Sequence, residues 1–285
     1  MPARIPSQLP SPGQHRSTTG TILAWSHPGL LVLIACAVFA WYFTIIAAGD
    51  MPAGPGTMGI GLAGFLAGWT LMMTAMMLPA LAPLLSAYLR SIRTVQNAWV
   101  RAARSSALLI GYLLTWMLFG LFAYGAAELF GILAAEVPDT APWIGAGLLV
   151  SAGIYQLTPL KNFCLRHCRS PLAFLLHVSR YKGPLRDVRV GLYHGTYCVG
   201  CCWGMMIVLI LVGTMNLAWM AVIAAAILLE KTWSRGTAFS KITGIALIVF
   251  ALLVPANPAL LPGLYPAPGM SQNMEPDISP DMPGM

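Results

Sequence analysis

Long runs of uncharged, apolar residues are the feature that most constrains how this chain can fold. Each run approaches the roughly 20 residues that an α-helix needs to cross about 30 Å of hydrocarbon. Seven such runs lie at residues 29–48, 59–80, 107–130, 142–159, 194–213, 217–232 and 239–255. Only 9% of the residues are charged, against roughly 25% in a typical soluble domain. The sequence therefore predicts an all-α, polytopic transmembrane helix bundle of about seven spans.

The segments outside these runs divide the chain into three predicted regions. Residues 1–28 are rich in Pro and Ser and lack an early apolar core, so we expect a disordered cytoplasmic tail without a cleaved signal. Residues 29–255 form the predicted transmembrane domain, with a long basic cytoplasmic loop at 160–193. Residues 256–285 contain seven prolines, which predicts a Pro/Met-rich external tail without a packed core.

The distribution of basic residues predicts the orientation. All 16 Lys and Arg residues fall before residue 29 or near alternate connections, at 81–106, 160–193 and 231–241. Cytoplasmic loops carry an excess of Lys and Arg, so we expect the N-terminus inside and the C-terminus outside. The net charge of +7 thus reflects membrane topology and gives no reason to expect a nucleic-acid partner.

The most unusual stretch is "HGTYCVGCCWGMM", residues 194–206. On a helix, Cys198, Cys201, Cys202, Met205 and Met206 share one face, with His194 one turn earlier. Soft sulfur ligands favour Cu(I), and thiolates also suit zinc. If the helix begins near residue 194, its N-terminal dipole would also stabilise thiolates there. The alternative is that these residues are ordinary apolar packing.

A second sulfur cluster lies in the second predicted span. Met72, Met73, Met76 and Met77 share a helix face in the cytoplasmic half of that span, at the depth of the cysteines. The two clusters could face one another and form a sulfur-rich pocket. Core packing is the alternative for the methionines.

The predicted cytoplasmic loop contains "KNFCLRHCRSP", residues 161–171. If this stretch is helical, Cys164, His167 and Cys168 fall at i, i+3 and i+4 and can converge on one metal ion. His194, Cys198 or His177 could complete such a site, because no second Cys/His pair follows at zinc-finger spacing. An unliganded basic turn is the alternative.

Three weaker features complete the candidates. The external tail carries Met270, Met274, Met282 and Met285, which are thioether ligands or incidental residues of a disordered tail. Glu230 is a possible counter-ion near the end of the sixth span, or half of a snorkelling interfacial ion pair with Lys231. Cys36 stands alone in the first span and is interpreted as packing.

Four segments carry a resemblance to a known family: "GWTLMMTAMMLPA", "YQLTPLKNFCLRHCRSPLAFL", "GLYHGTYCVGCCWGMM" and "MNLAWMAVIAAAILLEK". Together they cover residues 59–231, and the third is the most specific. The chain resembles a bacterial family of predicted metal-binding integral membrane proteins of unknown function, some described as copper chaperone-like. The resemblance implies a multi-pass protein of the bacterial inner membrane with a metal site on these cysteines and methionines.

The leading functional hypothesis is a non-enzymatic membrane protein that binds copper, most readily Cu(I), for transfer, transport or delivery. Its partners would be the lipid bilayer, the metal ion and a copper acceptor in the membrane or periplasm. No Gly-rich phosphate-binding loop with a lysine is present, which argues against an ATP-driven pump. The alternatives are a thiol–disulfide oxidoreductase using Cys198 and Cys201, and a structural zinc-binding subunit.

Overall fold

The computed structural model describes residues 28–50, 56–57, 59–178, 180–214 and 216–264. Within these ranges the chain forms helices joined by turns, without β-strands, so the all-α prediction is confirmed. The helices are α1 (Pro28–Asp50), α2 (Leu62–Ser91), α3 (Ala98–Glu136), α4 (Ala141–Leu157), α5 (Pro159–Arg169), α6 (Pro171–Val178), α7 (Arg186–Leu211), α8 (Leu217–Thr232) and α9 (Gly236–Leu253), followed by the 3-10 turn η1 (Pro258–Leu260).

Five of the described helices are long and apolar enough to cross a membrane: α1, α2, α3, α7 and α9. The bent pair α4–α5 raises the number to six if it counts as one span. A helix occupies each of the seven predicted ranges, but α8 has only 16 residues and falls short by length. The prediction of a multi-pass helical protein is therefore confirmed, with five or six candidate spans.

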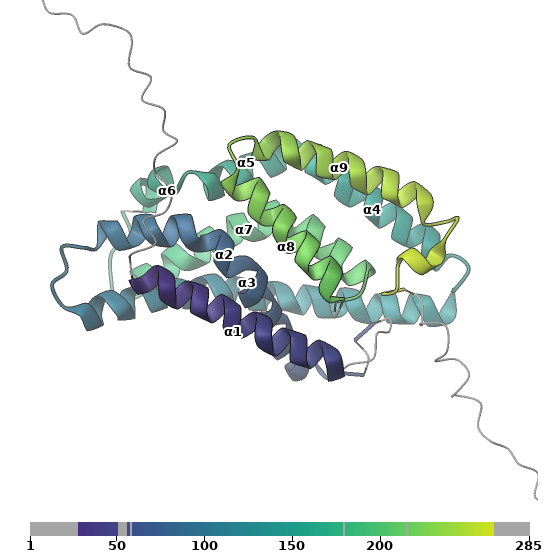
Figure 1. The fold of residues 1–285 in the computed structure, drawn as a ribbon, viewed down its shortest axis with the longest axis horizontal. Helices are drawn as coiled ribbons and strands as arrows, with labels where there is room; N and C mark the ends of the chain where they lie inside the picture. The colour runs from purple at the N-terminus through teal and green to yellow at the C-terminus, as the bar shows by residue number, and fades with distance from the viewer. Residues whose placement is uncertain (1–27, 51–55, 58, 179, 215, 265–285) are drawn as a thin grey trace, which may run out of the picture.

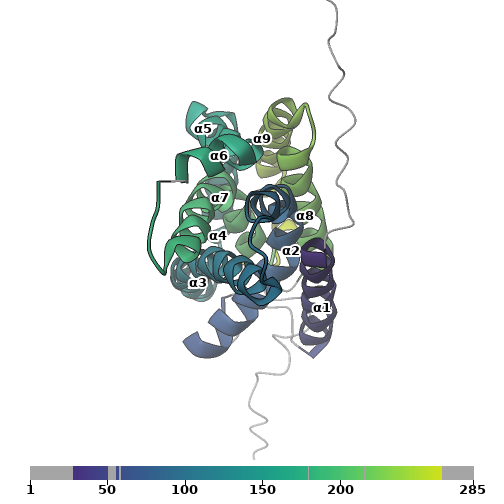
Figure 2. The ribbon, with the colours of Figure 1, turned by 90° about the vertical axis from the view of Figure 1, so that its left-hand side faces the viewer.

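The described helices pack lengthwise into one bundle, in which α1 begins toward the left and α9 ends toward the right of Figure 1. The most extensive helix pairs are α3 with α7, α1 with α2, and α4 with α9. The short helices α5 and α6 lie at the end of the bundle that faces the viewer in Figure 2, where α5 packs against α7. The bundle thus brings α5, α7 and α8 into mutual contact.

Side-chain caps define where several helices begin. The Asn97 side chain accepts hydrogen bonds from the backbone of Trp99 and Val100 at the start of α3. Asn216 caps α8 in the same way through the Trp219 backbone N–H. Such caps satisfy N–H groups that have no partner within the helix.

A sharp break separates α4 from α5. Thr158 caps α5 through the Lys161 backbone N–H, and Pro159 occupies the first turn, so the chain turns by 61° between the two helices. The predicted connection over 160–193 is therefore not an irregular loop throughout. Two short helices and the first turns of α7 occupy most of that segment, because its caps and apolar residues support helices that pack on the bundle.

Two glycines allow α3 and α7 to approach closely. A Cβ atom at Gly191 of α7 would collide with the Leu108 carbonyl oxygen of α3, and one at Gly111 of α3 would collide with the Val188 carbonyl oxygen of α7. Only a glycine on each side permits this backbone contact. The close approach brings Tyr112 of α3 to the cysteine face of α7.

Candidate soft-metal site

The helix that carries the sulfur-rich stretch begins earlier than its apolar run indicates. α7 starts at Arg186, so Cys198 lies about three turns inside the helix. A helix dipole acts within the first turn, and the expectation that it stabilises thiolates on this stretch is therefore wrong. The predicted shared face is present, because five sulfur-containing residues are buried in the hydrophobic core: Cys198, Cys201, Cys202, Met205 and Met206.

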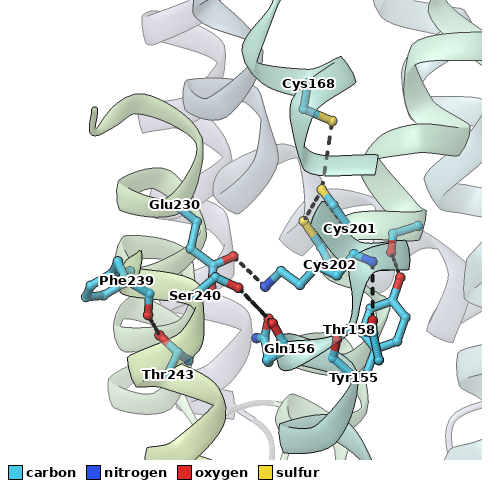
Figure 3. A network of polar contacts seen from close by, with 12 residues as sticks. Tyr155, Gln156, Thr158, Cys168, Cys201, Cys202, Glu230, Phe239, Ser240 and Thr243 are labelled. Carbon is cyan, nitrogen blue, oxygen red and sulfur yellow. Dashed lines mark hydrogen bonds and ion pairs between the residues drawn. The ribbon is translucent and has the colours of Figure 1, made fainter. Parts of the chain in front are cut away.

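Three thiols from two helices form the centre of the site (Figure 3). The Sγ atoms of Cys201 and Cys202 are 3.2 Å apart, and the Sγ atom of Cys168 on α5 is 3.8 Å from that of Cys201. All three side chains are buried, and none forms a disulfide. We call Cys168, Cys201 and Cys202 the thiol cluster.

Cys198 has different neighbours, which come from two other helices. The Lys231 ammonium of α8 donates to the Cys198 sulfur at 2.9 Å, and the Tyr112 hydroxyl of α3 lies 3.0 Å from the same sulfur. Lys231 is only 8% exposed, so its charge has little access to water. A buried ammonium at this distance stabilises a thiolate, which is the effect that the helix dipole cannot supply here.

A buried ion pair lies next to Lys231 along α8. The Glu230 carboxylate accepts from the Lys161 ammonium of α5 at 2.7 Å, and both side chains are almost fully buried. Its second oxygen, Oε1, has no hydrogen-bond partner among the described residues. Glu230 and Lys231 are thus buried and bound to α5 and α7, not to each other, so the interpretation as a snorkelling interfacial pair is wrong.

Further contacts hold α5, α8 and the turn after α8 together. The Arg169 guanidinium donates to the carbonyl oxygens of Trp233 and Ser234 at 2.6 and 3.0 Å. On the other side of the ion pair, the Ser240 hydroxyl bonds to Gln156 at 3.3 Å, which links α9 to α4 (Figure 3). These bonds fix the ends of the helices that supply Cys168 and Lys231.

His194 lies one turn before Cys198 on α7. It is 4% exposed, and its Nδ1 atom has no hydrogen-bond partner among the described residues. The ring packs between Tyr112 and Phe174, at centroid distances of 6.0 and 5.1 Å. An unpartnered imidazole nitrogen beside thiols is available as a further ligand.

The three residues expected to converge on one metal ion from α5 do not do so. The stretch is helical as the prediction required, and Cys168 joins the thiol cluster. Cys164 instead lies against the backbone of Gly200, and the His167 ring stacks on Tyr197 at 4.2 Å while its Nδ1 bonds to a backbone carbonyl. Helical spacing alone does not show which side of α5 faces the thiol cluster, because that depends on how α5 packs against α7.

The methionines of α2 are buried in the same core cluster as the cysteines: Met72, Met73, Met76 and Met77. α2 packs mainly on α1 and α3 and more narrowly on α8 and α6, and in the described part of the chain it shares no extensive backbone contact with α7. A pocket formed directly between the two sulfur faces therefore remains a prediction. The tail residues Met270, Met274, Met282 and Met285 lie outside the described residues.

The donor set fits a soft metal ion, although the side chains are not fully arranged around one. Among the described residues, no group of three His, Cys, Asp or Glu side chains has the geometry to hold a metal ion. Three sulfur ligands about 2.3 Å from one ion would lie about 4 Å apart. The Cys201 sulfur lies 3.2 Å from that of Cys202 and 3.8 Å from that of Cys168, which are separations near that value.

Sequence reasoning missed two neighbours of this site. Tyr112 and Lys161 gave no signal beyond their positions near the ends of apolar segments. Cys36, which we interpreted as packing, is exposed on α1, because that helix contacts the bundle on one side only.

Comparison with known protein families identifies a match over most of the bundle. Residues 66–254, roughly two thirds of the chain, match the family described as PpoB2, copper chaperone. No curated protein and no solved structure matches the chain. The match spans α2 to α9 and includes every cysteine of α5 and α7. The resemblance inferred from the four sequence segments is confirmed, and the chain belongs to the PpoB2 copper chaperone family.

Proposed function

We propose that this protein carries Cu(I) within the membrane and that the thiol cluster is the site that holds it. The observation that carries the proposal is that two other buried thiols lie close to the Cys201 sulfur: Cys202 of α7 at 3.2 Å and Cys168 of α5 at 3.8 Å. Thiolates prefer Cu(I) among the common biological metals, and membership of a copper chaperone family supports the same ion. The family description also favours metal carriage over thiol–disulfide catalysis.

Charge balance explains the role that we assign to Lys231. Cu(I) bound by two thiolates has a net charge of −1, which is unfavourable in a site shielded from water. The Lys231 ammonium, 2.9 Å from the Cys198 sulfur, supplies the compensating charge. Glu230 cannot serve this purpose, because its carboxylate is also an anion, and that charge is already balanced by Lys161 at 2.7 Å.

We further propose that copper moves by ligand exchange between neighbouring sulfur atoms. The candidate sites along the path, which copper could follow in either direction, are the methionines of the external tail, the α2 methionines, Cys198 with the thiol cluster, and Cys164 and His167 on α5. The α2 methionines are Met72, Met73, Met76 and Met77. His194, Met205 and Met206 are further donors beside the cysteines. The recipient would be a copper acceptor in the membrane or periplasm.

The proposed setting is a bacterial inner membrane, with the N-terminus in the cytoplasm and the C-terminus outside. Seven helices in the seven predicted ranges support an odd number of crossings, as does the direction of α1 and α9, which both run from left to right in Figure 1. In this arrangement residues 1–28 form an inner tail, 29–255 the membrane domain and 256–285 an outer tail.

The test is the metal content of the purified protein. After anaerobic loading with Cu(I), the triple variant C168S/C201S/C202S should lose most of the copper measured by elemental analysis. C36S is the matched control, because Cys36 is exposed and remote in sequence from the cluster. Unchanged copper stoichiometry in the triple variant would contradict the proposal, and zinc in place of copper in the protein as isolated would favour a structural zinc site.

A further inference from the structure

A second site lies at one end of the bundle, apart from the cysteines. A cavity of about 470 Å³ opens between the end of α2, helix α6 and the start of α7. Its lining combines three arginines with an aromatic and apolar wall: Arg90, Arg93, Arg186, Tyr88, Leu175 and Val178.

The three arginines have no carboxylate partner in the described part of the chain. Its two ion pairs are Arg104–Asp187 and Lys161–Glu230, and neither involves an arginine of the cavity. Asp187 is the nearest acidic residue along the chain, but its carboxylate is bound by Arg104 at 2.9 Å and by the Tyr88 hydroxyl at 2.6 Å. The cavity therefore has an uncompensated positive charge.

One arginine also has an unsatisfied buried group. The Nε atom of Arg186 is buried and has no hydrogen-bond partner among the described residues. A buried donor without a partner is unfavourable, so the Arg186 guanidinium, which lines the cavity, has unused capacity to bind an anionic oxygen. Membrane topology alone explains why basic residues lie on one side of the membrane, but it does not explain a buried guanidinium nitrogen without a partner.

We propose that this cavity binds the phosphate group of an anionic phospholipid. Its position favours a lipid over free phosphate, because it lies where α2 ends and α7 begins, two helices long enough to cross a membrane. The arginines bind the phosphate, and the apolar side chains of α6 contact the first part of an acyl chain. Basic pockets between membrane helices bind anionic headgroups by this combination of charge and apolar contact.

The experiment measures lipid binding to the intact protein by native mass spectrometry in a zwitterionic detergent. Wild-type protein should retain phosphatidylglycerol in preference to phosphatidylcholine. R186Q should weaken the binding of phosphatidylglycerol by about fivefold, and R90Q/R93Q should weaken it further, since each basic residue contributes about 1 kcal/mol. R186K keeps the charge and should retain most of the binding.

The matched control is R189Q. Arg189 is exposed, lies one turn after Arg186 on α7 and does not line the cavity, so the same change of charge there should leave lipid binding intact. Equal binding by wild type, R186Q and R90Q/R93Q would overturn the proposal. Displacement of phosphatidylglycerol by an equal concentration of inorganic phosphate would also overturn it, by identifying a free-phosphate site. Copper stoichiometry is independent of these outcomes.

Discussion

The cysteine face of α7 and the methionine face of α2 are equally buried but differ in their surroundings. Cys198 contacts an ammonium and a hydroxyl from two other helices, and the thiol cluster lies close to a buried ion pair. The α2 methionines belong to the apolar core, on a helix with buried alanines and leucines around them. Sulfur content alone therefore does not define a metal site. The charged and polar partners make the cysteine region chemically distinct.

The largest effect on stability is expected from a substitution that breaks the buried ion pair beside the cysteine region. K161M leaves the Glu230 carboxylate buried without a counter-charge, which should lower the free energy of unfolding by about 3–5 kcal/mol. Denaturation of the detergent-solubilised protein measures the change. The double variant K161M/E230L removes both charges and should recover most of the loss; equal instability of the single and double variants would show that the pair is not the cause.

Substitution of a glycine tests the packing that brings Tyr112 to Cys198. G191A places a methyl group against the α3 backbone, which should destabilise the protein by about 1–3 kcal/mol. Gly68 on α2 is the control, because nothing lies within 4 Å of a Cβ atom built there and G68A should be neutral or slightly stabilising. Equal thermal stability of the two variants would refute the close α3–α7 contact.

Removal of the cation beside Cys198 should weaken copper binding with little loss of stability. We expect K231M to lower the affinity for Cu(I) about tenfold, equivalent to about 1.4 kcal/mol, because a bis-thiolate complex loses its counter-charge. Competition with a Cu(I)-specific chelator measures the affinity. K241M is the matched control, since Lys241 is exposed on α9. A wild-type affinity in K231M would remove Lys231 from the proposed site.

The smallest effect is expected in the methionine region. M76L preserves volume and apolar character, so its free energy of unfolding should change by less than about 1.5 kcal/mol. If the α2 methionines only pack the core, their replacement by leucine should leave the copper stoichiometry at the wild-type value. If their thioethers bind copper, the same replacement should lower it. Elemental analysis of M72L/M73L/M76L/M77L after Cu(I) loading distinguishes the two and decides whether α2 belongs to the transfer path.

The elements of this fold were largely predictable because their signals are local. Apolar runs located α1, α2, α3 and α9 within a few turns, and the Cys/Met spacing on α7 identified its buried face. The partners across helices were not predictable. Lys231 meets Cys198, and Cys168 but not His167 reaches Cys201, because α5 crosses α7 after the break at Thr158 and Pro159. Such pairings depend on how each helix is rotated about its own axis and on where the helices cross. No short sequence pattern specifies either.

The contacts at the end of α8 also fix that helix about its own axis. Glu230 and Lys231 are consecutive, so their side chains leave the helix about 100° apart. One is bound to α5 and the other to α7, through polar contacts of 2.7 and 2.9 Å. A turn of α8 in either direction lengthens at least one of them. The last turn of α8 is therefore held at two points, and any rotation of this helix would also change the contact between Lys231 and the Cys198 sulfur.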